Sequence, residues 1–274
     1  MLVALVAGGV AFLLFGGDGE ATELRLRFAP GQTMSYRLTV HDQGSGEAAD
    51  SGYNTVTTAT LGLDVRSVAG GVATTTASVT DVKVAPAALE PSELGSLADQ
   101  TARFAEDGRQ LDSIVVIADE SGRFLSLADP VFPFLPPDAV SVGDDWTVDG
   151  HQALSVGTGG TTFSGTARLT RLEDEGRTAV VEADVTETWD FVADAQQIGV
   201  LGRGAGEETT NTVTWNGTER LHLTSRIDTR NGVVTYTVVR DDYDLTITSG
   251  GGDGNDASVH NTGTFRQEAE LVRS

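Results

Sequence analysis

The residues best suited to bind a metal ion form a short acidic stretch near the C-terminus, 251-GGDGND-256. This stretch fits the G-G-x-G-x-D repeat that binds calcium in secreted β-roll proteins. Asp253, Asn255 and Asp256 would supply the hard oxygen ligands that calcium prefers. Such sites need several stacked copies, and the chain has a single copy with Ser258 where a large apolar residue belongs. We therefore expect a flexible hairpin loop and no metal, with a weak calcium site as the alternative.

No other residues have the types and spacing of a catalytic or metal-binding site. The histidines are scattered along the chain, at His41, His151, His222 and His260. His222 alternates with Leu221 and Leu223, which places it on the polar face of a strand. The sequence contains no nucleophile elbow, Walker loop or Rossmann glycine fingerprint. We expect no catalytic and no cofactor-binding residue, although any two of the 40 acidic residues could form the carboxylate pair of a hydrolase.

The composition excludes several classes of function. The 18 basic and 40 acidic residues give a formal charge of −22, which repels nucleic-acid phosphates, so we exclude a nucleic-acid binder. The absence of cysteine excludes disulfides, thiolate metal sites, cysteine nucleophiles and a lipid-modified cysteine. A hydrophobic content of 39% is slightly low for a globular protein but too high for disorder throughout the chain.

The first 17 residues, MLVALVAGGVAFLLFGG, are uncharged and mostly apolar, and Asp18 follows them directly. As a helix this run would span ~25 Å, slightly less than the ~30 Å hydrocarbon core of a bilayer. A cleaved signal peptide normally begins with basic residues, and none is present here. We expect a transmembrane anchor, or a signal segment, over residues 1–17. The membrane is then one partner, and the bulk of the chain lies outside the cytoplasm at the cell membrane.

From Leu24 onward, hydrophobic residues alternate with polar ones, as in 36-YRLTV-40 and 221-LHLTSRI-227. This period of two predicts antiparallel strands with one buried and one exposed face. Threonine and valine are abundant, as is typical of strands. Asn231-Gly232, between two such runs, is the strongest hairpin signal in the chain.

Two parts of the chain share the same order of expected elements. Residues 59–84 and 165–191 each read as a strand, a glycine turn and a second strand. Between them, residues 130–140 hold four of the seven prolines, which predicts a rigid connector. We therefore predict two related β-rich units, 22–130 and 131–274, with independently recurring hairpin patterns as the alternative to duplication.

One helix is expected in each unit. Over residues 92–105, Ser92 can cap the N-terminus, and Leu97 and Phe104 fall on one face of a helix. Residues 192–202 predict a shorter helix at the corresponding place. The predicted fold is mainly β, with two related curved antiparallel sheets as tandem half-barrel-like units. Each sheet carries a covering helix, and both follow the N-terminal membrane anchor helix.

Two motifs carry a resemblance to a known family. The stretches 24-LRLRF-28 with 30-PGQTMSY-36, and 133-PFLPPDAVSVGDDW-146, resemble uncharacterised bacterial cell-envelope proteins of actinobacterial type. Those proteins begin with L-R-x-x-F-x-x-G-x-x-Y-x-Y and later carry L-P-x-x-x-V-x-x-G-D-x-W. Here Met34 replaces the first tyrosine and Ser141 a frequent lysine. The resemblance implies shared structure, frequent membrane anchoring and no particular activity. More loosely, the layout is similar to lipoprotein-carrier half-barrels, in which a curved sheet and a helix enclose an apolar cavity.

These patterns predict a non-enzymatic envelope protein that binds a hydrophobic ligand or a protein partner in a cavity between sheet and helix. A structural or scaffold module with a solid core is the alternative, and a carboxylate-dependent hydrolase is a more distant one. The expected binding partners are a lipid or another envelope protein. We expect no cofactor.

Overall fold

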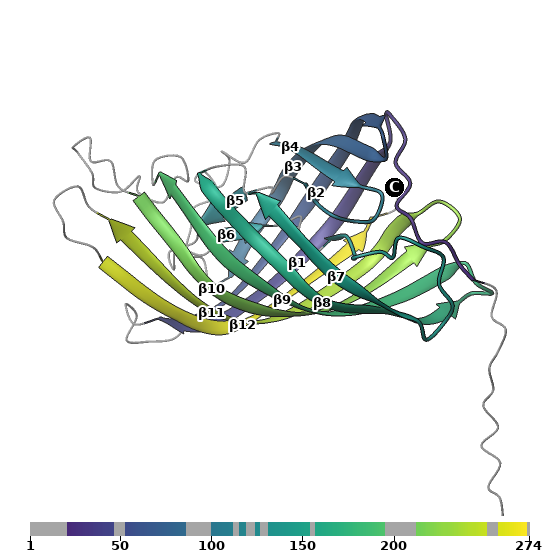
Figure 1. The fold of residues 1–274 in the computed structure, drawn as a ribbon. Helices are drawn as coiled ribbons and strands as arrows, with labels where there is room; N and C mark the ends of the chain where they lie inside the picture. The colour runs from purple at the N-terminus through teal and green to yellow at the C-terminus, as the bar shows by residue number, and fades with distance from the viewer. Residues whose placement is uncertain are drawn as a thin grey trace, which may run out of the picture.

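Antiparallel strands make up most of the described structure. The structure is a computed structural model of the chain, and it describes residues 21–46, 53–85, 100–111, 115–118, 124–126, 131–153, 157–194, 212–250 and 257–272. The strands are β1 (Thr33–Gly46), β2 (Tyr53–Ala69), β3 (Val72–Ala85), β4 (Gln100–Ala105), β5 (Val115–Ala118), β6 (Phe124–Ser126), β7 (Asp145–Ala153), β8 (Thr158–Glu173), β9 (Thr178–Asp194), β10 (Thr212–Asp228), β11 (Val233–Gly250) and β12 (Ala257–Leu271). Ten of them form one sheet, in the order β4-β3-β2-β1-β12-β11-β10-β9-β8-β7, and β5 pairs with β6 (Figure 1).

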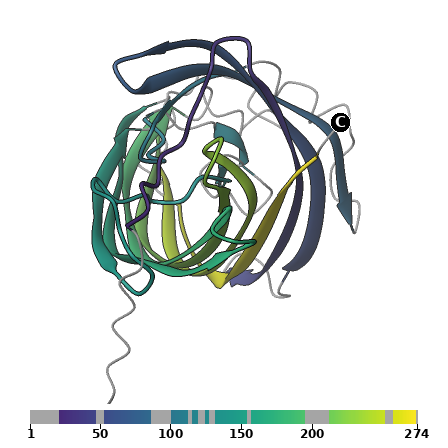
Figure 2. The same ribbon diagram turned by 90° about the vertical axis from the view of Figure 1, so that its right-hand side faces the viewer.

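The large sheet curls on itself, so that Figure 2 shows its strands arranged as an open ring. Side chains on the concave face are buried and those on the convex face are exposed, as the alternation predicted. In β10, for example, Trp215 and Leu223 are buried, whereas Arg220 between them is exposed. The pairing of β8 with β9 shifts register between Leu169 and Arg171, where two residues of β8 stand opposite one of β9. Such a β-bulge increases strand twist and favours the curl of the sheet.

The two halves of the chain belong to one continuous sheet. Strand β1 pairs with β12 along most of its length, from Tyr36 opposite Leu271 to Gly46 opposite Asn261. The prediction of two separate curved sheets is therefore wrong. An unpaired edge strand exposes backbone donors and acceptors, and pairing the edge of one half with the edge of the other satisfies both. The division into units 22–130 and 131–274 stays a prediction.

The covering helices were also predicted wrongly, because no α-helix occurs in the residues that the structure describes. Residues 100–105 of the predicted helix 92–105 form β4, which pairs with β3. Ala102 and Phe104 of β4 are buried and Arg103 is exposed, an alternation of period two. Strand β9 likewise continues to Asp194, into the predicted helix 192–202. The remainder of both predicted helices lies outside the described residues.

The predicted transmembrane helix, and membrane anchoring through it, also need correction. Within the described ranges, no helix has the length and apolar character needed to cross a bilayer. Residues 1–17, on which that prediction rests, lie outside these ranges.

An N-terminal strap, defined here as residues 21–32, crosses the opening of the ring in Figure 2. Thr22 and Val140 exchange two backbone hydrogen bonds of 2.8 and 3.0 Å, and the Leu26 N–H donates to the Glu106 carbonyl at 2.7 Å. Glu106 directly follows β4 and Val140 shortly precedes β7, and these are the two edge strands of the sheet. The strap therefore ties the two edges of the curled sheet together.

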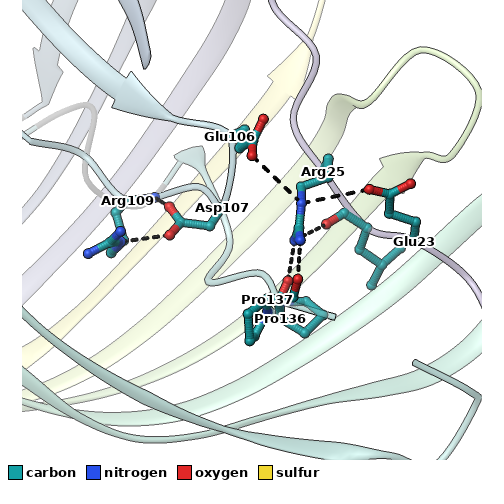
Figure 3. A network of polar contacts seen from close by, with 8 residues as sticks. Glu23, Arg25, Glu106, Asp107, Arg109, Pro136 and Pro137 are labelled. Carbon is teal, nitrogen blue, oxygen red and sulfur yellow. Dashed lines mark hydrogen bonds and ion pairs between the residues drawn. The ribbon is translucent and has the colours of Figure 1, made fainter. Parts of the chain in front are cut away.

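Arg25 fixes this strap to the proline-rich segment (Figure 3). Its guanidinium donates hydrogen bonds to the backbone carbonyls of Pro136 and Pro137, and its side chain is 20% exposed. Its Nε lies 3.9 Å from a carboxylate oxygen of Glu23 and 4.0 Å from one of Glu106. Arg25 belongs to the first motif of the family resemblance and the two prolines belong to the second. The two motifs therefore contact each other directly.

The proline-rich segment, predicted as a connector, packs in the interior of the protein. Val131, Phe132 and Leu135 are buried, and the Thr237 hydroxyl donates a hydrogen bond of 3.0 Å to the Val131 carbonyl. Gly108 contacts this segment so closely that a Cβ on it would lie 1.8 Å from the Pro133 carbonyl oxygen. The segment is part of the core because its apolar side chains are removed from water there.

An aromatic cluster of Phe28, Tyr36, Phe104 and Phe132 fills the space beneath the strap. Phe132 is at its centre, with ring centroids 4.7 Å from Phe104, 5.9 Å from Phe28 and 6.4 Å from Tyr36. The Tyr36 hydroxyl donates to the Val234 carbonyl at 3.1 Å, and burial raises the pKa of Tyr36. This end of the concave face is therefore tightly packed.

Candidate functional site

A cavity lies on the concave face beside the aromatic cluster, which contributes Phe132 to its wall. Its volume is about 100 Å³, and strands β7 to β12 and the loop of residues 108–111 after β4 line it. Much of the wall is apolar, with side chains such as Phe163, Leu221 and Phe265. A close-packed protein interior has few voids larger than a water molecule, so this cavity distinguishes the part of the concave face that strands β7 to β12 form.

Three buried carboxylates line the same cavity: Glu187 on β9, Glu219 on β10 and Asp241 on β11. They are 6%, 7% and 2% exposed. Glu187 and Glu219 stand directly opposite each other in the β9–β10 pair, and Asp241 stands opposite Leu221, the next inward position of β10. Side chains directly opposite in antiparallel strands have Cβ atoms about 4.5–5.5 Å apart. Adjacent strands therefore concentrate negative charge in one part of the wall.

A row of polar side chains adjoins these carboxylates. Gln152 on β7 is opposite Thr161 on β8, Thr161 is opposite Trp189 on β9, and Trp189 is opposite Gly217 on β10. Trp189 lines the cavity, two residues beyond Glu187 on the same face of β9. Within the described part of the chain, the indole Nε1 of Trp189 and the hydroxyl of Thr161 are buried and have no hydrogen-bond partner. Buried polar atoms without partners are uncommon in folded proteins, and Trp189 places one in the cavity wall.

Little positive charge reaches the cavity from the described residues. Arg109 lines it, but its Nε donates to the Asp107 carboxylate at 2.7 Å, and the Asp107 side chain also accepts the Arg109 backbone N–H at 3.1 Å. His151 is at the exposed end of the lining, together with Asp149. The described lining thus holds four carboxylates and one guanidinium, and the guanidinium already has a carboxylate partner.

A further buried carboxylate, that of Asp42, lies in the neighbouring wall and contacts a tyrosine hydroxyl. Asp42 on β1 accepts a hydrogen bond of 3.3 Å from the Tyr243 hydroxyl. A Cβ on Gly263 would lie 2.3 Å from that hydroxyl oxygen, so only glycine leaves room for the tyrosine. Asp42 and Asp241 both stand opposite Phe265 of β12, on its two sides. Phe265 therefore separates Asp42 on β1 from the acidic band, which consists of Glu187, Glu219 and Asp241 on β9 to β11.

Asp253, Asn255 and Asp256, the ligands of the alternative calcium site, lie outside the described residues, as does the loop that the sequence predicted there. Among the residues that are described, no group of three or more acidic or histidine side chains could hold a metal ion. The predicted polar face for His222 is confirmed: its ring lies 2.8 Å from the Asp184 carboxylate on the convex side of the sheet.

The three tryptophans lie in different surroundings. Trp215 packs against Phe191 in the interior, with ring centroids 5.1 Å apart, whereas Trp189 lines the cavity. Trp146 is partly buried, and its indole Nε1 donates to the Phe134 carbonyl at 3.2 Å.

The sequence interpretation missed the buried carboxylates, although a signal for them was present. Glu187 falls in phase with the apolar residues Val185 and Trp189, and Asp241 falls in phase with Val239 and Tyr243. A polar residue on the apolar phase of a strand points toward the concave face. The sequence could not select a pair among its acidic residues, because the pairing of β9 with β10 depends on the tertiary fold.

No protein-family model matches this chain, and none of the curated proteins is similar to it in sequence. The resemblance to cell-envelope proteins therefore stays a prediction.

Proposed function

We propose that this chain is a binding protein that holds a small apolar or amphiphilic molecule in the cavity of its curled sheet. The observation that carries the proposal is the cavity itself, of about 100 Å³, on the concave face of strands β7 to β12. Cavities with mostly apolar walls and a few well-placed polar groups are typical of small-molecule sites. Here Phe163, Leu221 and Phe265 supply apolar wall, and Glu187, Glu219 and Trp189 supply polar groups.

The contrast within the concave face favours a binding protein over a solid scaffold. Phe132 and its aromatic neighbours pack against one another beneath the strap, so this chain contains side chains large enough to fill its interior. A scaffold module would gain stability by filling the cavity in the same way, because each buried methylene contributes about 0.8 kcal/mol. This interior keeps a cavity and buried polar groups, so it lacks the stability that filling the cavity would add. A binding function explains why the cavity is kept.

A hydrolase is the second candidate, favoured by one observation. Glu187 and Glu219 face each other directly in the cavity wall. Side chains paired in this way have Cβ atoms about 4.5–5.5 Å apart, and retaining glycosidases hold their two carboxyl groups about 5–5.5 Å apart. Screening the chain against nitrophenyl glycosides tests this candidate: hydrolysis that Glu187→Gln and Glu219→Gln both abolish would support it.

Binding can be tested with the full chain, purified without detergent. Native mass spectrometry should detect a co-purified small molecule, and the neutral probe N-phenyl-1-naphthylamine should bind with increased fluorescence. Val239→Phe places a larger side chain in the cavity wall and should weaken probe binding at least about tenfold. Val142→Phe is the matched control, because Val142 is 51% exposed and does not line the cavity.

The two variants separate binding in the cavity from binding elsewhere. Thermal unfolding of both should first establish that they fold. If the wild type shows no co-purified mass and no probe binding, the proposal is refuted. Equal loss of probe affinity in Val239→Phe and Val142→Phe would assign the binding to a site other than the cavity.

A further inference from the structure

We propose that the ligand of this cavity is an amphiphile with a protonated amine beside its apolar body. This inference rests on the proposed function and specifies the class of ligand. The apolar wall receives the body of the molecule, and the acidic band across β9, β10 and β11 receives the amine.

The first support is the electrostatic character of the wall. Glu187, Glu219 and Asp241 come from three adjacent strands, and each is less than a tenth exposed. Charge–charge attraction is several times stronger in a partly desolvated site than in water, since the effective dielectric constant is lower. The same field disfavours an anionic head group such as a carboxylate or phosphate. Arg109 supplies the guanidinium of the described lining, and its Nε donates a hydrogen bond of 2.7 Å to the Asp107 carboxylate.

The second support is independent of the acidic residues. Trp189 is nine-tenths buried in the cavity wall, and its indole Nε1 has no hydrogen-bond partner in the described structure. Beside it, the buried Thr161 hydroxyl oxygen is also without a partner there. Thr161 adjoins the cavity wall without lining it, so Trp189 carries this support: the face of its indole ring attracts cations. An oxygen next to the amine would accept the indole N–H.

The positions of these groups fit one head group. Trp189 and Glu187 are two residues apart on one face of β9, Thr161 is opposite Trp189, and Glu219 is opposite Glu187. Neighbouring positions of this kind lie about 5–7 Å apart on a sheet face. One ammonium group can therefore contact a carboxylate and an aromatic ring at the same time. Among the residues that the structure describes, no such combination surrounds the aromatic cluster beneath the strap.

The test compares three ligands that share one apolar body, n-octylamine, n-octanol and n-octanoate, by calorimetric titration of the full chain at pH 7. The buffer contains 0.15 M salt, which screens charges on the protein surface beyond about 8 Å. We expect octylamine to bind at least about tenfold more tightly than octanol, and octanoate to bind least.

Two double variants with the same change of charge show where the preference arises. Glu187→Gln with Glu219→Gln removes two carboxylates from the cavity wall and should reduce the preference for octylamine to within about threefold. Asp190→Asn with Asp242→Asn removes two exposed carboxylates of β9 and β11 and should leave the preference unchanged. Because glutamine and glutamate have the same shape, the apolar contacts of octanol should persist in the first variant.

Each outcome has a defined meaning. Octanol or octanoate binding as tightly as octylamine would overturn the inference and leave the proposed binding function standing. A preference for octylamine that falls equally in both double variants would also overturn the inference, because it would come from the net charge of the protein. If none of the three ligands binds, the proposed function fails as well.

Discussion

Replacing Arg25 with methionine tests whether the contact between the two motifs stabilises the curled sheet. Methionine keeps an apolar stem and removes the guanidinium, so the Pro136 and Pro137 carbonyls lose their donor. Hydrogen bonds to a charged group contribute about 1.5–3 kcal/mol each. The Arg25 side chain is 20% exposed, and water can replace part of this loss. We expect the free energy of unfolding to fall by about 2–4 kcal/mol, below the sum of two full hydrogen bonds.

The ion pairs of Arg25 contribute much less to this value. Glu23 and Glu106 lie 3.9 and 4.0 Å away, with side chains 64% and 58% exposed. Exposed pairs contribute about 0–1 kcal/mol and are screened by salt. The loss in Arg25→Met should therefore persist in 1 M NaCl, where the Debye length is about 3 Å.

Urea unfolding of the full chain, followed by circular dichroism, measures this loss. Arg25→Lys should fall between wild type and Arg25→Met, because an ammonium group lacks the planar fork that reaches two carbonyls. Arg37→Met is the control: Arg37 is 65% exposed, lies 3.7 Å from Glu270, and should change stability by no more than about 0.5 kcal/mol. An Arg25→Met loss no larger than that of the control would refute the reasoning. A loss that disappears at high salt would assign the effect to the ion pairs instead.

Two further predictions concern the packed end of the sheet. Gly108→Ala should cost at least about 2 kcal/mol more than Gly143→Ala in the same unfolding assay. Both glycines have a positive φ, of 88° and 97°, but only at Gly108 would a Cβ collide with the Pro133 carbonyl; equal losses would contradict the close approach. Burial raises the pKa of Tyr36 above its unfolded value of about 10, so its contribution to stability is complete below pH 10 and declines above it. Tyr36→Phe should remove up to about 1.4 kcal/mol per pH unit from the alkaline slope of wild-type stability, and an unchanged slope would contradict this assignment.

Local patterns in the sequence were sufficient for the strands and their turns. Alternation along 221-LHLTSRI-227 placed His222 on the convex face and Leu223 on the concave one, as found. The hairpin predicted at Asn231-Gly232 joins β10 to β11 through residues 229–232, and Gly232 there has a positive φ of 63°, which glycine readily adopts. These features depend on residues a few positions apart, so they can be inferred without knowing the rest of the fold.

The segment 100–105 shows where local patterns become ambiguous. Phe104 fits an apolar stripe of period 3.6 when it is read with Leu97, and it fits a period of two when it is read with Ala102. Pairing with β3, where Ala73 stands opposite Phe104, decides for the strand. Packing against Phe132 then gives this strand a buried face that an isolated helix would not have.

Composition and alternation were enough to predict a mainly β protein, the inward and outward positions of many side chains, and the absence of cysteine chemistry. The pairing of β1 with β12, which turns two expected sheets into one, became known from the folded structure. The folded structure also brings the Arg25 guanidinium to the Pro136 carbonyl. It pairs Glu187 with Glu219 across β9 and β10, beside Trp189. The physical reason is that strand order is set by long-range pairing. A short-range pattern states which face a side chain occupies but not which strand lies beside it.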